Sequence, residues 1–152
     1  MKEIKAPEPI DNARMHVFLA GSIEMGAAEK WQEKVVAALT GYNVTVLNPR
    51  RADWDSSWVQ SIDNAQFKEQ VDWELTAMQL ADVIAMYFDP NTKSPITLLE
   101  LGLHARNGKL IVCCPEGYWR KGNVDVVCNR YYVPQVTTID DLIQAVVKKV
   151  KS

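Results

Sequence analysis

Apolar residues along this chain form short continuous runs that alternate with stretches of helical periodicity. The continuous runs predict buried strands at residues 15–20 (MHVFLA), 44–47, 82–88 (DVIAMYF) and 109–114, with a shorter fifth strand near 131–136. Apolar positions at helical spacing predict helices over residues 27–39, 64–80, 94–106 and 139–150. Strands that alternate with helices favour parallel βαβ units, and continuous apolar strands favour a sheet covered by helices on both faces.

This order of elements predicts one α/β domain over residues 1–152, a doubly wound parallel five-stranded sheet of flavodoxin-like type with strand order 2-1-3-4-5. Residues 1–14 are polar and contain two prolines, so we expect an extended N-terminal segment there. Ser94 is expected to cap a helix that has Pro95 at its first position. Ligands of such sheets bind beyond the carboxyl ends of the strands, so chemistry is expected in the segments that follow the strands.

Composition restricts the class of partner. Hydrophobic residues make up 47% and charged residues 24%, which is typical of globular proteins, and the formal net charge of −2 offers no basic field to polymeric nucleic acid or to a membrane. The chain has no run as long as a membrane span, and residues 1–14 lack the apolar core of a signal peptide. Three cysteines, two of them adjacent, favour reduced thiols over a disulfide framework or a zinc site. We therefore expect a cytoplasmic protein that needs no metal or cofactor.

Glu100 is the polar residue that stands out most. It lies in a helix that is apolar nearly all round (ITLLELGLHA), where an ionised carboxylate is costly unless it is hydrogen-bonded or functional. The alternative is a structural glutamate near a helix N-terminus, favoured by the helix dipole and paired with a neighbour. His104 follows one helical turn later and could face Glu100, although an ordinary helix position explains it equally well.

A second carboxylate, Glu74, lies in the helix that leads into the third strand, and Asp72 is close enough to take the same part. Two acids in different environments can divide the tasks of nucleophile and proton donor, whereas the alternative is a pair of solvated helix charges. Residues 48–55 (NPRRADWD) place arginines, aspartates and a tryptophan beyond a strand end, where they would bind a base or form a surface loop with local ion pairs. No GxGxxG pattern or P-loop supports a dinucleotide or a nucleoside triphosphate.

Several segments together resemble the nucleoside 2-deoxyribosyltransferase family. They are VFLAGSI (residues 17–23), the ADVIAMYF strand, LLELGLHARNGK (98–109) and the stretch 115–123 that ends in GN. The segments NPRR.DW and QV.WE are similar to the short-chain branch of this family, and the resemblance spans about residues 15–136.

The resemblance implies roles for particular residues. Glu100 occupies the position of the family's glutamate nucleophile, which attacks the anomeric carbon. Glu74, 26 positions earlier, matches an acid that helps hold the substrate and assists proton transfer. Asn123 matches an asparagine that a neighbouring subunit supplies to the 5′-hydroxyl, which implies a homo-oligomer.

The chain also departs from the family pattern. Phe18 stands where some members have a tyrosine in the first strand, and Ser94 stands where some have an aspartate that reads the base. Base recognition is then expected from other groups, with Asp53, Arg50 and Asp89 as candidates. The residues expected at the substrate are Phe18, Gly21, Ser22, Asp53, Asp72, Asp89, Ser94 and Asn123.

The implied activity is exchange of the base of a 2′-deoxynucleoside with a free nucleobase, as in nucleotide salvage. It would proceed through a covalent 2-deoxyribosyl-glutamate and retain configuration. One alternative is a hydrolase of 2′-deoxynucleoside 5′-monophosphates, with Arg120 or Lys121 near the phosphate. Another is a non-catalytic nucleotide-binding module, because flavodoxin-like folds carry many functions. Purine or pyrimidine preference and the size of the oligomer stay open.

Overall fold

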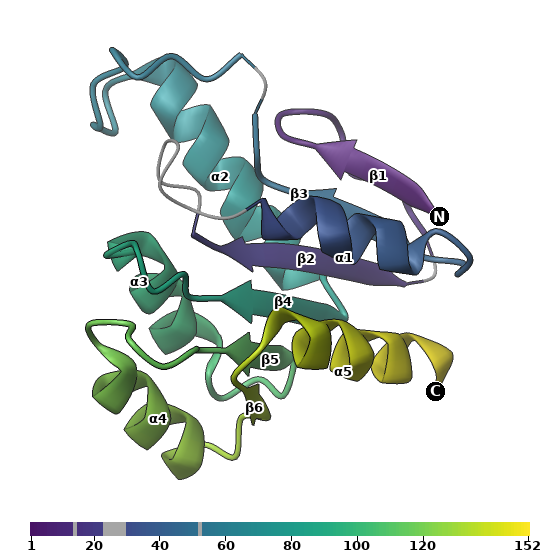
Figure 1. Cartoon of the computed structure of the whole chain (residues 1–152). Helices are drawn as coiled ribbons and strands as arrows, with labels where there is room; N and C mark the ends of the chain where they lie inside the picture. The colour runs from purple at the N-terminus through teal and green to yellow at the C-terminus, as the bar shows by residue number, and fades with distance from the viewer. Residues whose placement is uncertain (14, 23–29, 52) are drawn as a thin grey trace.

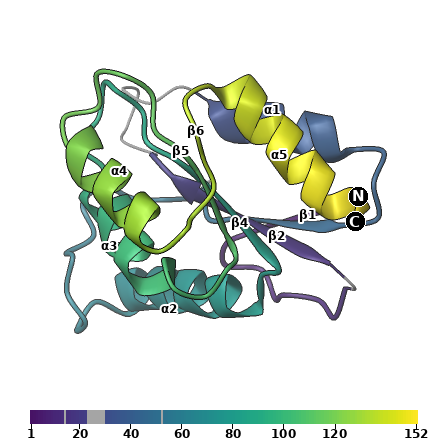
Figure 2. The same ribbon diagram turned by 90° about the horizontal axis from the view of Figure 1, so that it is seen from below.

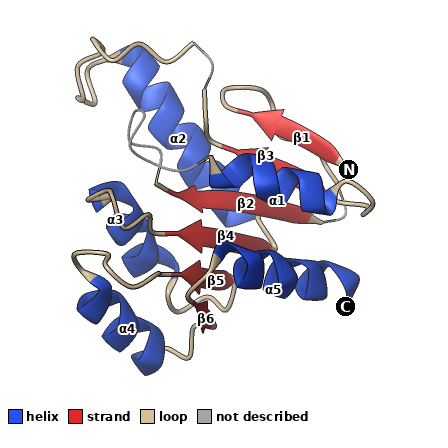
Figure 3. Cartoon of the chain, viewed as in Figure 1, coloured by secondary structure: helices blue, strands red, loops and turns tan. Residues whose placement is uncertain are grey.

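The apolar runs pair into a single parallel sheet in the computed structural model, which describes residues 1–13, 15–22, 30–51 and 53–152 (Figures 1 and 3). The described residues contain six strands in the order β1-β3-β2-β4-β5-β6. Their bounds are β1 (Lys2–Lys5), β2 (His16–Gly21), β3 (Thr45–Asn48), β4 (Val83–Tyr87), β5 (Leu110–Cys113) and β6 (Gln135–Val136). The flavodoxin-like α/β class is confirmed, and the five expected strands follow one another in the expected order.

The expected count of five strands was wrong, because β1 lies in the segment expected to be merely extended. β1 adds to the sheet edge beside β3, with Lys2 opposite Thr45 and Lys5 opposite Asn48. Ile4 is the one residue of this strand that is buried in the core. A strand with a single buried apolar side chain has no apolar run to reveal it, and its lysines suit a sheet edge.

Helices cover both faces of the sheet (Figure 2). α1 (Trp31–Leu39) and α5 (Ile139–Lys151) lie on one face, and α2 (Ala65–Leu80), α3 (Pro95–His104) and α4 (Lys121–Arg130) lie on the other. Side chains alternate along β2, so Val17 and Leu19 pack into the core under α1 and α5, whereas Phe18 packs into the core under α2 and α3. No helix within the described residues is long and apolar enough to span a membrane.

Helix α4 (Lys121–Arg130) is a difference from the expected elements. The apolar pattern predicts no helix at α4, which begins at Lys121. It buries few side chains, chiefly Val124 and Cys128 one turn apart, so its sequence carries little periodicity. The expected start of the first helix at residue 27 lies outside the described residues, as does Ile23 of the VFLAGSI segment.

Candidate active site

Helix α3 presents Glu100 from the buried side of the helix. Thr97, Glu100, Leu101 and His104 recur at helical spacing and are all buried, and Glu100 is 7% exposed. The helix starts directly after the loop that follows β4, so Glu100 lies near the carboxyl edge of the sheet. Its surroundings are those of a core residue, although its side chain carries a carboxyl group.

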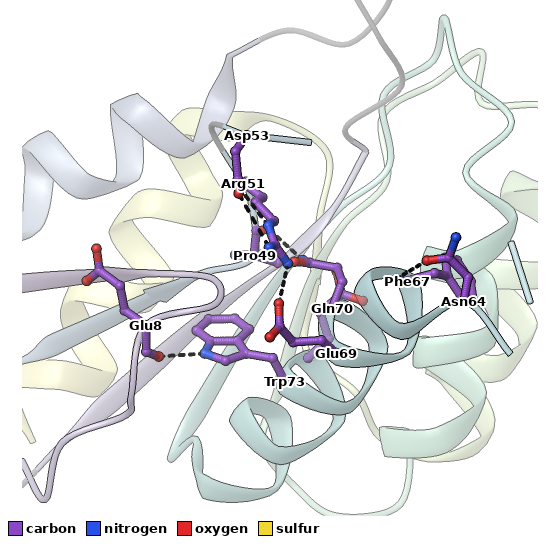
Figure 4. A network of polar contacts seen from close by, with 10 residues as sticks. Glu8, Pro49, Arg51, Asp53, Asn64, Phe67, Glu69, Gln70 and Trp73 are labelled. Carbon is purple, nitrogen blue, oxygen red and sulfur yellow. Dashed lines mark hydrogen bonds and ion pairs between the residues drawn. The ribbon is translucent and has the colours of Figure 1, made fainter. Parts of the chain in front are cut away.

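Helix α2 brings a second carboxyl group, that of the half-buried Glu74, to the same face of the sheet. Gln70, one turn before Glu74, donates its Nε2 hydrogens to Glu74 Oε1 at 3.3 Å and to the Pro49 carbonyl oxygen at 2.8 Å. Figure 4 shows Gln70 reaching Pro49. This contact ties the turn of α2 that carries Glu74 to the chain just beyond β3.

Both carboxyl groups have raised pKa values, and the charge of Glu74 contributes to the rise at Glu100. Burial raises the pKa of Glu74 to about 7, although the hydrogen bond from Gln70 opposes this rise. Burial, followed by the charge of Glu74, raises the pKa of Glu100 to about 8. Near neutral pH the pair therefore retains a proton, which is the arrangement that lets one carboxylate attack while the other group donates a proton.

Three buried hydroxyl groups join the carboxyl ends of β2 and β4. Ser22 Oγ lies 2.5 Å from Ser94 Oγ and 3.0 Å from Thr92 Oγ1, and the last two lie 2.6 Å apart. The Asp89 amide donates to Ser22 Oγ at 2.9 Å. These bonds hold the loop between β4 and α3 against β2, and so fix the start of the helix that carries Glu100.

Ser94 does not cap α3 as expected. Its backbone is left-handed, with φ 48°, and its hydroxyl group makes no capping bond because it is bonded to Ser22 and Thr92 instead. Pro95 does occupy the first turn of the helix.

Gly21 lies where two strands and an indole ring approach closely. A Cβ atom on this residue would come within 2.5 Å of the Tyr87 carbonyl oxygen and 2.8 Å of the Trp31 ring. The position therefore excludes every side chain. Asp89, at the end of β4, is buried, and its Oδ1 accepts from the Asn91 amide at 2.8 Å.

Three other expected site residues differ in how exposed they are. Phe18 has no exposed surface and packs 6.5 Å from the Trp73 ring, so in this structure it serves packing. Asp72 is exposed and pairs with Lys68 on its own helix. Asn123 is exposed in the first turn of α4.

The loop after β3 forms local ion pairs. Arg51 donates to Asp53 at 2.7 Å and to Glu69 at 2.8 Å (Figure 4). Its guanidinium lies 5.1 Å from the centre of the Trp58 ring. Asp53 is exposed and its charge is engaged by Arg51. The interpretation of this loop as a surface element with local pairs therefore fits Asp53 better than base recognition does.

Sequence reasoning missed two residues that position the site, Gln70 and Thr92. The i, i+4 spacing of Gln70 and Glu74 was a usable signal, because such residues are neighbours on a helix. His104 bonds through Nδ1 to Asn107 at 2.6 Å. In the described ranges, histidine, cysteine, aspartate and glutamate side chains form no group of three or more that could hold a metal ion.

Comparisons with known proteins show the family and the fold of the chain. A family model described as "Nucleoside 2-deoxyribosyltransferase like" matches residues 14–118, a range that contains Glu74 and Glu100 but not Asn123. A solved structure, that of a conserved protein from Enterococcus faecalis V583, superposes with a TM-score of 0.62 at 13% identity. The match covers 90% of this chain and 99% of that one, and shows a shared fold. No curated protein matches the chain.

Proposed function

The chain belongs to the nucleoside 2-deoxyribosyltransferase-like family, and from that premise we propose that it is a cytoplasmic enzyme that exchanges the base of 2′-deoxynucleosides, with Glu100 as nucleophile. The observation that supports this proposal most is the pair formed by the buried Glu100 and the half-buried Glu74, whose charge contributes to raising the pKa of Glu100. Two carboxyl groups with raised pKa values, presented by two helices at the carboxyl edge of the sheet, fit a reaction that needs a nucleophile and a proton donor.

In the first half of the reaction, the ionised carboxylate of Glu100 attacks the anomeric carbon of the sugar. A carbon–oxygen bond to Glu100 forms as the bond between the anomeric carbon and the base nitrogen breaks, and the proton of Glu74 passes to the departing base. In the second half, a new base attacks the same carbon and returns a proton to Glu74, and Glu100 leaves as a carboxylate. Two displacements give net retention.

The remaining expected residues take supporting roles in the proposal. Ser22, Ser94 and Asp89 lie at the carboxyl ends of β2 and β4, where the sugar would be held next to Glu100. Asn123 of a second subunit would contact the 5′-hydroxyl, and its exposed position on α4 leaves it accessible to such a neighbour. Closure of the pocket by that subunit would keep water away from the glycosyl intermediate.

Hydrolysis of 2′-deoxynucleoside 5′-monophosphates is the nearest competing reaction, and it requires a cation for the phosphate. Lys121 is engaged, since its ammonium donates to the Cys114 carbonyl oxygen at 3.1 Å and to Asp125 at 3.0 Å. Arg120 lies over the Trp119 ring at 4.3 Å. The engagement of Lys121 weighs against a dedicated phosphate site and in favour of transfer from free nucleosides.

A donor and acceptor panel tests the proposal. The protein is incubated with each of the four common 2′-deoxynucleosides, and separately with their 5′-monophosphates, with and without a free base, and the products are separated by chromatography. We expect a new nucleoside only when a nucleoside donor and an acceptor base are both present. Base release from monophosphates without exchange would establish the hydrolase instead, and the absence of any cleavage would establish a binding module.

A further inference from the structure

A cavity of about 370 Å³ lies at the start of α1 and the carboxyl ends of β1 and β3. Its polar lining includes Glu3, Lys5, Lys30, Gln32, Asn48 and Arg50. α1 covers the sheet face opposite to α2 and α3, as Figure 2 shows. The cavity is therefore separate from the acidic pair, which α2 and α3 carry.

The sheet register explains why these polar side chains meet. In a parallel pair, residues that are in register point to the same face, and Glu3 is in register with Val46 while Lys5 is in register with Asn48. Val46 belongs to the core under α1. The alternation of side chains therefore turns Glu3, Lys5 and Asn48 toward α1, at the point where the strands end.

Gln32 is the unusual member of this group. It is 1% exposed, yet neither its Nε2 nor its Oε1 has a hydrogen-bond partner in the part of the chain that the structure describes. Asn48, by contrast, is satisfied, since it donates to Glu3 at 3.0 Å and accepts from the Arg50 amide at 3.0 Å. Buried polar groups are almost always hydrogen-bonded, so an unpaired amide that lines a cavity indicates that its donor and acceptor are meant for a ligand.

The charges around the cavity favour an anion. Lys5, Lys30 and Arg50 line it together with Glu3 and Glu33, and one of these carboxylates, Glu3, already accepts from Asn48. Lys30 occupies the N-cap position of α1 and makes no side-chain capping bond. The N-terminus of a helix next to cations attracts negative groups, and the Gln32 amide, unpaired within the described residues, adds a donor and an acceptor.

We propose that this cavity binds a small anionic molecule that carries an amide-like edge able to donate and accept hydrogen bonds, as a nucleoside monophosphate does. A glutamine amide pairs with adenine through two hydrogen bonds, one donated and one accepted. Lys5, Lys30 and Arg50 then receive the phosphate. The volume of about 370 Å³ lies in the range of small-molecule sites, and the cavity is independent of the reaction proposed above.

Adenosine 5′-monophosphate is the probe, because its 2′-hydroxyl distinguishes it from the proposed donors. Binding is measured by calorimetry and by amide spectra of ¹⁵N-labelled protein, in which the side-chain Nε2 signals of Gln32 report its hydrogen bonds directly. Adenine and inorganic phosphate are tested separately, to measure how tightly each part of the nucleotide binds alone. The variants are Gln32→Met and Arg50→Met, with Gln79→Met on the exposed side of α2 as the matched control and Glu100→Gln as the control for binding at the acidic pair.

We expect the nucleotide to bind more tightly than either component and to shift the Gln32 Nε2 signals. Gln32→Met should weaken binding by at least about tenfold and Arg50→Met by a similar factor, whereas Gln79→Met and Glu100→Gln should leave it unchanged. Gln32→Met should also keep or raise the melting temperature of the free protein, because it removes an unpaired buried amide. The proposal is overturned if the probe does not bind, if Glu100→Gln abolishes binding that Gln32→Met leaves intact, or if Gln32→Met lowers the melting temperature by several degrees.

Discussion

Glu74 and Glu100 lie on different helices, yet the charge of Glu74 contributes to raising the pKa of Glu100. Burial also raises the pKa of each of the two carboxyl groups, so both favour the protonated form more than an exposed glutamate does. The pKa of Glu100 is raised further than that of Glu74, so the proton that the pair retains favours Glu100. The form with Glu100 ionised and Glu74 protonated, which the proposed reaction requires, is therefore the less populated form of the singly protonated pair.

The pH dependence of catalysis follows from this pair. Activity requires one proton on the two groups together, so we expect kcat/KM to be bell-shaped, with a maximum between pH 7 and 8. Glu74→Gln should lose the alkaline limb, because no proton donor remains to titrate, and should lower kcat by about 10²–10⁴-fold. Initial rates of base exchange across pH 5–10 provide the measurement, and an unchanged bell in Glu74→Gln would show that Glu74 is not the donor.

Stability should depend on pH in the opposite sense to that of a salt-bridged carboxylate. A carboxyl group whose pKa is raised in the folded state binds its proton more tightly there, so the folded protein loses stability as pH rises from about 4.5 to about 8. Glu100→Gln should therefore raise the free energy of unfolding by about 2 kcal/mol or more at pH 8, and by much less at pH 5. Urea denaturation at both pH values checks this.

Glu116→Gln, at an exposed position, is the matched control for that experiment and should show no such difference between pH 5 and pH 8. An equal effect of Glu100→Gln at both pH values would mean that burial does not disfavour the ionised form of Glu100.

The fold was largely predictable because its strands are buried on both faces. Continuous apolar runs revealed β2, β3, β4 and β5, and the alternation with helices gave their order. β1 and α4 escaped because each buries very little, with Ile4 the one core residue of β1. Local patterns report burial, so elements that contribute little to the core leave little trace in the sequence.

The site was predictable in part for the same reason. Glu100 stood out because a carboxyl group interrupts an apolar helix. The hydroxyl cluster did not, because Ser22 and Thr92 are 70 positions apart and their contact exists only once β2 and β4 are paired. Ser94 was expected to be a helix cap on local grounds, and the long-range bond to Ser22 prevailed. Hydrogen-bond partners far apart in the chain are set by topology and not by local pattern.

Gly21 should tolerate no side chain. Gly21→Ala places a Cβ atom 2.5 Å from the Tyr87 carbonyl oxygen, so β2 and β4 must separate locally. We expect a loss of about 1–3 kcal/mol in the free energy of unfolding, the range typical of overpacking. Gly41→Ala is the control, since nothing lies within 4 Å of the added atom there. Equal melting temperatures for the two variants would contradict the close approach at Gly21.

A shared site between subunits can be tested by mixing two variants that are each impaired in a different part of the site. Asn123→Ala should lower kcat/KM while leaving the fold intact, because the residue is exposed in the single chain. Mixed with Glu100→Ala in equal amounts under conditions that exchange subunits, it should recover about a quarter of the native activity if a two-fold dimer forms. No recovery, with subunit exchange shown by mass spectrometry, would place Asn123 outside the partner's site.

The proposed reaction requires Glu100 to form a covalent bond to the sugar. The protein is incubated with a 2′-deoxynucleoside in the absence of an acceptor base, quenched in acid, digested, and analysed by mass spectrometry. We expect a 2-deoxyribosyl adduct on the peptide that contains Glu100, and Glu100→Gln should lack the adduct and lose at least about 10³-fold in kcat/KM. Near-normal base exchange by Glu100→Gln, or an adduct on another residue, would show that Glu100 is not the nucleophile.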